Sequence, residues 1–435
     1  MKVTVIGAGL AGCEAAYYLA RHGVDVELWE MKPEKFSPAH SREGFAELVC
    51  SNSLKSDDPA TASGMLKTEM RMLGSVVLSC ADVTSVPAGG ALAVDRDAFS
   101  DAVTEKLSGL PNITVIRKEA VEIPAEGAVI IATGPLTSDA MASRIEALTG
   151  GEGLHFFDAA SPIVTAESID PEKSFRLARY GRGGDDYINC PLTREEYEAF
   201  WNELVNAETA PLHEFEKDCK VFESCMPVEI AAKRGIDTLR FGIMKPVGLT
   251  DPSTGRRPYV VLQLRQDNSD GTLYNLVGFQ TNLKFGEQKR VFSMIPALAN
   301  AEYVRYGVMH RNTYLDSPNL LDHNFSLKSD PRIYFAGQMT GVEGYIESAM
   351  SGLVAGIACC KKLRGEELPP FPRETGIGAL TSYISEKNAD FQPMNANFGI
   401  LPDLDEHIRD KKEKRRRLSE RSALMLKAFI EENGI

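Results

Sequence analysis

Two cysteines of this chain lie among residues that suit thiolate chemistry. Cys50 is surrounded by polar side chains in the segment ELVCSNSLKS, and Cys225 precedes Pro227 in the segment FESCMPVE. A thiolate is a strong nucleophile, and its polar surroundings control its reactivity. None of the eight cysteines forms a CxxC pair or lies at zinc-like spacing to a histidine. We therefore expect thiol chemistry at Cys50 and Cys225, and no metal site.

A glycine-rich turn near the N-terminus has the spacing of a dinucleotide-binding site. An apolar run over 2–7 leads into the turn, a helix is expected over 13–21, and a strand over 24–29 ends at Glu30. In such a βαβ unit the glycines allow a tight turn, close approach to a pyrophosphate and close helix packing, and the terminal acid binds ribose hydroxyls. The predicted contacts are Gly7, Ala8, Gly9, Leu10, Ala11, Gly12 and Glu30.

Two later segments indicate which dinucleotide binds. An apolar run over 128–131 ends in Ala-Thr-Gly, and a second over 333–336 precedes a glycine-rich turn and a helix of small residues over 348–358. This order resembles the glutathione-reductase-like superfamily of FAD proteins rather than NAD dehydrogenases. The resemblance implies FAD contacts at Ala132, Thr133, Gly134, Gly337, Gln338, Gly341, Gly344 and Tyr345.

The fold class expected is α/β, a doubly wound FAD-binding domain interrupted by a large α+β substrate domain. About 200 residues between the second and third FAD segments exceed what the nucleotide fold needs. We expect the FAD-binding domain over 1–155 and 326–435, and an inserted substrate and RNA domain over 156–325. Further strands are expected over 113–116, 121–123, 259–264 and 273–279, and a helix over 95–107.

Composition and charge limit the class of protein. Hydrophobic residues make up 43% of the 435, which is ordinary for a globular protein and excludes general disorder. No apolar run is long enough for a membrane span, and no secretory signal is visible, so we expect a cytoplasmic protein without membrane partners. The net charge of −13 excludes nucleic-acid binding driven by overall charge.

The C-terminal segment departs from this acidic balance. Residues 409–421 hold eight Lys and Arg against three Asp and Glu, a local charge of +5, within a helix expected to begin near Leu404. Such a cluster can contact RNA phosphates, and the candidates are Lys412, Arg415, Arg416 and Arg417. The alternative is a solvated helix face whose other side docks through Leu418, Met425 and Phe429.

Seven blocks of the sequence resemble one family, the folate- and FAD-dependent tRNA (uracil-C5)-methyltransferases. They lie in the expected order along nearly the whole chain. One departure is Ser224, where a glycine is expected before the second cysteine. The blocks are residues 7–12, 46–54, 86–96, 244–249, 305–313, 335–345 and 391–399.

The resemblance implies methylation of C5 of a T-loop uridine in tRNA. Methylenetetrahydrofolate would donate the carbon, and FAD, reduced by NAD(P)H, would supply the hydride. Because C5 of uracil is a poor nucleophile, a thiolate must add to C6, and a base must later remove the C5 proton. The resemblance implies that Cys225 is the nucleophile and Cys50 the base near the flavin, with Lys55 as a candidate neighbour of Cys50. The pair His310 and Arg311 either contacts phosphate or folate carboxylates or is structural.

Other functions stay open at this point. The larger wobble-uridine tRNA-modifying flavoproteins share the FAD elements, although their loop has Cys-Asn-Pro in place of Cys50, Ser51 and Asn52. Ribosomal RNA methylation, a small-molecule FAD oxidoreductase and a non-catalytic flavin-bound RNA-binding protein are further alternatives. The preference for NADH or NADPH and the oligomeric state are not predicted.

Overall fold

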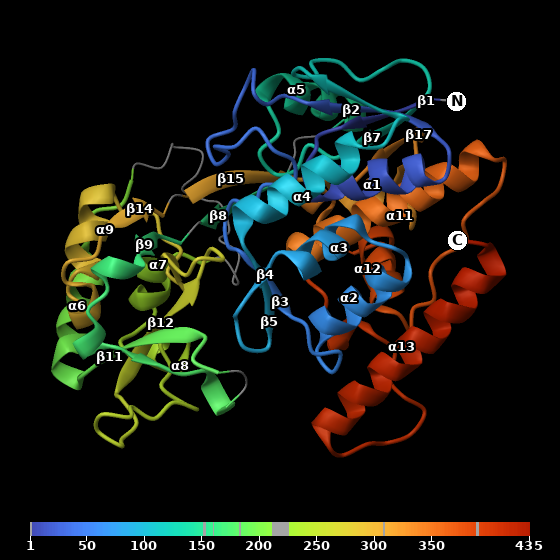
Figure 1. The fold of residues 1–435 in the computed structure, drawn as a ribbon. Helices are drawn as coiled ribbons and strands as arrows, with labels where there is room; N and C mark the ends of the chain where they lie inside the picture. The colour runs from blue at the N-terminus through green and yellow to red at the C-terminus, as the bar shows by residue number, and fades with distance from the viewer. Residues whose placement is uncertain are drawn as a thin grey trace.

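A six-stranded sheet forms the centre of the larger part of the molecule (Figure 1). The computed structural model describes residues 2–150, 154–159, 161–181, 184–210, 226–307, 309–388 and 391–435, so Cys225 lies outside the described residues. Five strands are parallel and the edge strand β16 is antiparallel, which confirms the expected doubly wound α/β class. In sheet order the strands are β16 (Ser326–Leu327), β17 (Asp330–Phe335), β7 (Ala128–Ile131), β1 (Lys2–Ile6), β2 (Asp25–Glu30) and β6 (Ile113–Arg117).

Small residues hold two helices tightly together beside this sheet. A Cβ atom on Gly352 of α11 (Tyr345–Leu363) would lie 2.0 Å from the carbonyl oxygen of Ala11 in α1 (Leu10–Arg21). The small-residue stretch of α11 is therefore a packing surface against α1. The other helices of this part are α2 (Ala62–Met72), α3 (Val76–Val83), α4 (Arg96–Ser108), α5 (Asp139–Thr149), α10 (Ser317–Leu320), α12 (Gly376–Ser385) and α13 (Lys411–Asn433).

The inserted segment has an antiparallel sheet and its own hydrophobic core. Its strands are β10 (Phe175–Arg176), β11 (Tyr187–Leu192), β12 (Val260–Gln266), β13 (Leu273–Leu276), β9 (Ile163–Thr165) and β14 (Tyr303–Arg305). Its helices are α6 (Arg194–Asn206), α7 (Val228–Lys233), α8 (Thr238–Phe241) and α9 (Phe285–Phe292). This core spans 164–301, and residues from Tyr314 onward pack in the other core. The domain limits at 155 and 325 stay predictions.

Two smaller sheets complete the fold. One is formed by β3 (Ser53–Ser56), β5 (Ala91–Val94) and β4 (Ser85–Val86), and the other by β8 (Leu154–Ala159) and β15 (Met309–Tyr314). His310 and Arg311 lie in β15, and their side chains are outside the description. No described helix combines the length and hydropathy that crossing a membrane requires.

Three local expectations were wrong. The last helix begins at Lys411 rather than near Leu404, because the carboxylate of Asp410 caps it by accepting a hydrogen bond from the backbone N–H of Glu413. Met425 is exposed, and Leu426 is instead buried, as are Leu418 and Phe429. Residues 121–123 form no strand.

Candidate functional site

One cavity lies where the carboxyl ends of the parallel strands meet. It contains about 1370 Å³ of space, part of it open to solvent. Ligands of open α/β sheets bind at this edge. Most of the residues predicted from the three FAD segments line it, together with Cys50: Gly7, Ala8, Gly9, Leu10, Ala11, Glu30, Ala132, Thr133, Gly134, Gly337, Gln338 and Tyr345.

The three glycines of the first turn have different surroundings. Gly7 has a φ of +102°, and a Cβ on Gly12 would lie 1.8 Å from the carbonyl oxygen of Gly7, so both positions need glycine for the backbone to fold. A Cβ on Gly9 would meet no atom within 4 Å, and α1 begins there without a side-chain cap. Gly9 and the first residues of α1 line the cavity, and a helix N-terminus in this position suits a phosphate.

Glu30 is held in place at the end of β2. Its carboxylate accepts hydrogen bonds from the backbone N–H groups of Ala8, at 3.1 Å, and Lys32, at 3.0 Å. The side chain is buried and lines the cavity. These contacts fix a carboxylate beside the glycine-rich turn, the position at which a ribose binds in nucleotide sites of this kind.

Three predicted contacts do not line the cavity: Gly12, Gly341 and Gly344. A Cβ on Gly341 would lie 2.4 Å from the ring of Phe391, and one on Gly344 would lie 2.2 Å from the carboxylate of Glu347. Both glycines have positive φ, so they shape the turn before α11. Their part in cofactor binding stays a prediction.

Residues from loops that carry no motif also line the cavity. They follow β2, β6 and β7 in the chain, so the rule that parallel strands end at one edge could have located them. They include Met31, Lys32, His40, Glu47, Lys118, Glu119, Thr137 and Ser138. Burial tends to raise the pKa of Glu47, but hydrogen bonds from the backbone N–H groups of Ser41 and Arg42, with Lys32 nearby, hold that pKa below its usual value.

Cys50 lies half-buried on the wall of this cavity, in a loop tied to the start of α11. The backbone N–H groups of Cys50 and Ser51 donate to the hydroxyl of Tyr345 at 2.7 and 3.2 Å. Burial raises the pKa of Tyr345, which keeps its phenol neutral. Lys55, the expected neighbour of Cys50, forms an ion pair with Glu347 at 3.0 Å.

Arginines from both parts of the molecule surround the Cys50 loop. Arg265 of β12 donates to the side-chain oxygens of Asn52, at 2.9 Å, and Ser51, at 2.6 Å. Arg96 of α4 donates to the carbonyl of Leu48 and pairs with Asp267 at 3.1 Å. Both Arg265 and Arg305 interact electrostatically with Cys50. No local pattern in the sequence predicted this cluster of arginines.

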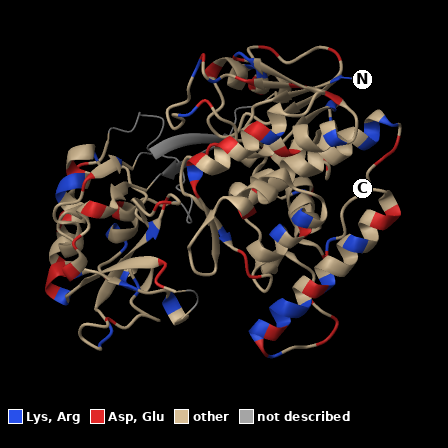
Figure 2. Ribbon diagram, in the orientation of Figure 1, with Lys and Arg blue, Asp and Glu red and all other residues tan. Residues whose placement is uncertain are grey.

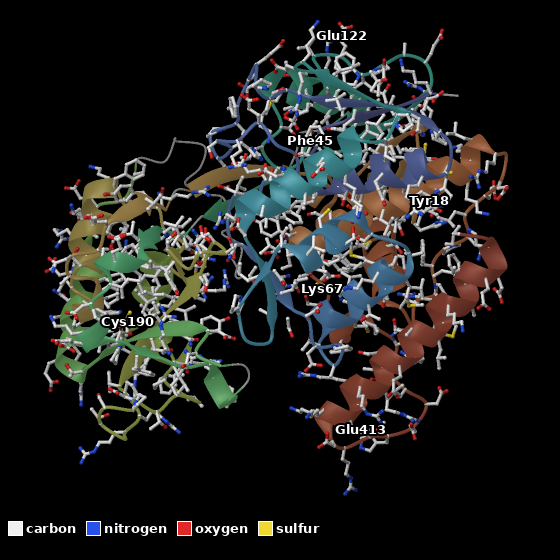
Figure 3. All side chains as sticks on the ribbon, viewed as in Figure 1. Tyr18, Phe45, Lys67, Glu122, Cys190 and Glu413 are labelled. Atoms are coloured by element: carbon white, nitrogen blue, oxygen red, sulfur yellow. The ribbon has the colours of Figure 1, made fainter. Side chains whose placement is uncertain are left out.

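The other described cysteines are buried in the protein interior. Cys190 lies in the insert (Figure 3). It is fully buried, and burial raises its pKa far above the usual value. Burial likewise raises the pKa of Cys359 to about 12. Within the described part of the chain, no three His, Cys, Asp or Glu side chains form a metal-binding group. The placement of Cys225 relative to Cys50 is not described.

Figure 2 shows basic residues together with acidic ones at the start of α13. Most of the basic residues of α13 are exposed, but several of their charges are paired. Arg416 pairs with Glu413 and Glu420, and Arg417 pairs with Glu406 at 2.8 Å. The guanidinium of Arg415 lies 5.9 Å from the centre of the Phe398 ring. No ion pair to Lys412 is present among the residues that are described.

Comparison with known proteins identifies the family of this chain. The family model described as glucose inhibited division protein A matches residues 2–367. The methylenetetrahydrofolate–tRNA-(uracil-5-)-methyltransferase TrmFO of Acetivibrio thermocellus is 59% identical over 98% of both chains, and that of Lactobacillus acidophilus is 56% identical over 98% of both. The chain belongs to the TrmFO family. The resemblance seen in the seven sequence blocks is thereby confirmed.

Solved structures agree with the fold of a TrmFO-family chain. Aquifex aeolicus GidA, in two crystal forms, superposes with a TM-score of 0.70 in each case. The identity is 16% and 17%, over 99% and 98% of this chain and 75% and 78% of the GidA chain. At this identity the likeness establishes the shared fold only.

Proposed function

We propose that this protein methylates C5 of a T-loop uridine in tRNA, with methylenetetrahydrofolate as the one-carbon donor. The observation that carries the proposal is the 59% identity, over 98% of both chains, to a methyltransferase named for that donor and that base. NAD(P)H is the reductant, and the reaction takes place in the cytoplasm, where tRNA is modified.

FAD is the cofactor that the cavity fits. Gly9 and the N-terminus of α1 would hold the pyrophosphate, and Glu30 would hold the ribose. The space beside Gly9 is open in the protein, and a Cβ on this residue would occupy part of it. The segments Ala132–Gly134 and Gly337–Gln338 would hold the rest of the molecule. Bound FAD supplies the reducing equivalents that convert the transferred carbon to a methyl group.

The two thiols act in different steps of the reaction on the uracil ring. The thiolate of Cys225 adds to C6 of uracil, which makes C5 nucleophilic, and Cys50 later removes the C5 proton. The position of Cys50 on the cavity wall, beside Tyr345, supports its role near the cofactor. The role of Cys225 rests on the family resemblance.

We also assign phosphate contacts to Lys412, Arg415, Arg416 and Arg417 of α13, which are exposed in a segment of local charge +5.

An assay with a tRNA transcript tests the proposed function directly. After incubation of the pure protein with methylenetetrahydrofolate and NAD(P)H, digestion and mass spectrometry should find 5-methyluridine in the T loop. Its absence from tRNA, or its appearance only in ribosomal RNA, would overturn the proposal.

A further inference from the structure

A second basic segment lies on the insert. Residues 233–257, here called the α8 surface, contain six Lys and Arg against two Asp, a local charge of +4 in a chain of −13. Lys233, Lys245, Arg256 and Arg257 are exposed, and within the described residues none of them has an ion pair. In α13, by contrast, Arg416 and Arg417 are paired with carboxylates.

Exposed aromatic and aliphatic side chains lie between these charges. Phe241 is 73% exposed, and Ile243 and Val247 are also exposed. Tyr180, 61% exposed, joins the same surface, because its backbone N–H donates to the carbonyl of Gly248 at 3.1 Å. Exposed rings between cations are typical of surfaces that stack nucleic-acid bases and bind phosphates.

The α8 surface is anchored to the hydrophobic core of the insert. Leu239 and Met244 are buried in the core of the insert, and the backbone of Met244 accepts a hydrogen bond from Val261 of β12 at 3.0 Å. The ring of Phe241 is therefore presented by an anchored turn. In Figure 1, α8 lies at the lower edge of the insert, on the same side of the view as the N-terminal end of α13.

We propose that the α8 surface binds the RNA substrate, with Lys245, Arg256 and Arg257 on phosphates and Phe241 stacked on an unpaired base. This inference rests on the proposed function and adds to it a site of substrate contact whose residues do not line the cofactor cavity. RNA fits the surface because its phosphates are complementary to the cations and its flat bases can stack on the exposed ring of Phe241.

The charge contribution is tested with two matched variants. In the first variant, Lys245, Arg256 and Arg257 are replaced by Gln. In the control variant, Gln replaces Lys173, Arg194 and Lys284, three exposed cations of the insert that are paired with carboxylates. Fluorescence anisotropy measures the affinity for an unmodified tRNA transcript over a range of salt concentrations. The slope of log affinity against log salt should fall in magnitude by about 2 to 3 in the first variant and stay unchanged in the control. Equal slopes in the two variants would overturn the inference.

The stacking contribution is tested at Phe241. Phe241→Ala should weaken tRNA binding on the order of ten-fold, and Phe241→Trp should restore it. Reduction of the bound flavin by NAD(P)H needs no RNA, so it should be unchanged in every variant and checks the fold. If Phe241→Ala instead changes the oligomeric state in light scattering and leaves tRNA affinity unchanged, the surface contacts another chain and the inference fails. If the unaltered protein makes no 5-methyluridine, it is the proposed function that fails.

Discussion

At the scale of single residues, the glycine turn shows how backbone space becomes a binding site. Gly7 and Gly12 are needed by the fold itself, whereas Gly9 faces open space. The spacing of the three glycines could be recognised in the sequence, because each requirement is local. The motif also predicts that Gly9 is the glycine that approaches the pyrophosphate, and the open space beside Gly9 fits that prediction.

Gly9→Leu should abolish flavin binding while leaving the fold intact. The new side chain has room in the protein alone, since nothing lies within 4 Å of its Cβ, but it occupies the space of the pyrophosphate. Absorbance between 350 and 500 nm, roughly the flavin range, should disappear, with an unchanged far-UV circular dichroism spectrum. Gly12→Ala is the control that should destabilise the fold itself. A Gly9→Leu protein that retains full flavin would contradict this placement.

The two thiols should fail differently when they are removed. With a tRNA carrying 5-fluorouridine, Cys225→Ala should form no covalent protein–RNA adduct, because no thiolate adds to C6. Cys50→Ala should still form the adduct but give no turnover, because proton removal comes later. Denaturing gels report the adduct. An adduct in Cys225→Ala and none in Cys50→Ala would reverse the two roles.

At the scale of helices and strands, local patterns located most elements of the larger part. Tertiary packing did not override the local signals for these elements. Such signals are the Gly-rich turn, the runs of β-branched residues and Asp95 before α4. The start of α13 was missed because the cap at Asp410 competes with other acidic residues nearby. The choice of Leu426 over Met425 depends on the rotation of α13 against α2, which no single-helix pattern fixes.

A buried carboxylate joins three helices. Glu69 of α2 accepts hydrogen bonds from the backbone N–H groups of Gly376, at 2.7 Å, and Ile377, at 2.8 Å, at the start of α12. The hydroxyl of Ser422 in α13 also donates to it. Burial raises the pKa of Glu69 to about 7 although these hydrogen bonds lower it.

Glu69 should therefore make stability depend on pH. Its pKa is about 4.3 in the unfolded chain, so between that value and about 7 the folded state binds more protons, and stability falls as pH rises. The free energy of unfolding of the native protein, minus that of Glu69→Gln, should fall by up to about 3 kcal/mol between pH 5 and 8. Urea titrations at several pH values measure this difference. A difference that stays flat or grows with pH would refute the assignment.

At the scale of the whole molecule, the Cys50 loop joins the two hydrophobic cores. Asn52 donates to Val94 in one part, at 3.0 Å, and to Gln266 of the insert, at 2.9 Å, and it accepts from Arg265. Gln266 and Arg265 are each more than 200 residues from Asn52 in the chain. The sequence offered no pattern for them, because long-range pairing depends on how the insert docks.

Arg265→Met should weaken this junction. Asn52 and Ser51 would each lose a buried donor, so the free energy of unfolding should fall by about 1 to 3 kcal/mol and turnover should decrease as the Cys50 loop loosens. Arg194→Met, an exposed control in the same part, should change stability by less than about 0.5 kcal/mol. Denaturant unfolding and single-turnover assays report the two effects. Native stability and turnover in Arg265→Met would contradict the role of the junction.

The origin of the methyl carbon tests the central claim most directly. The protein, charged with FAD, is incubated with tRNA, NAD(P)H and methylenetetrahydrofolate labelled with carbon-13 in its methylene group, and in parallel with methyl-labelled S-adenosylmethionine alone. The account predicts that mass spectrometry finds the label in the methyl group of 5-methyluridine from the folate reaction only. Label transferred from S-adenosylmethionine alone, without folate, would contradict it.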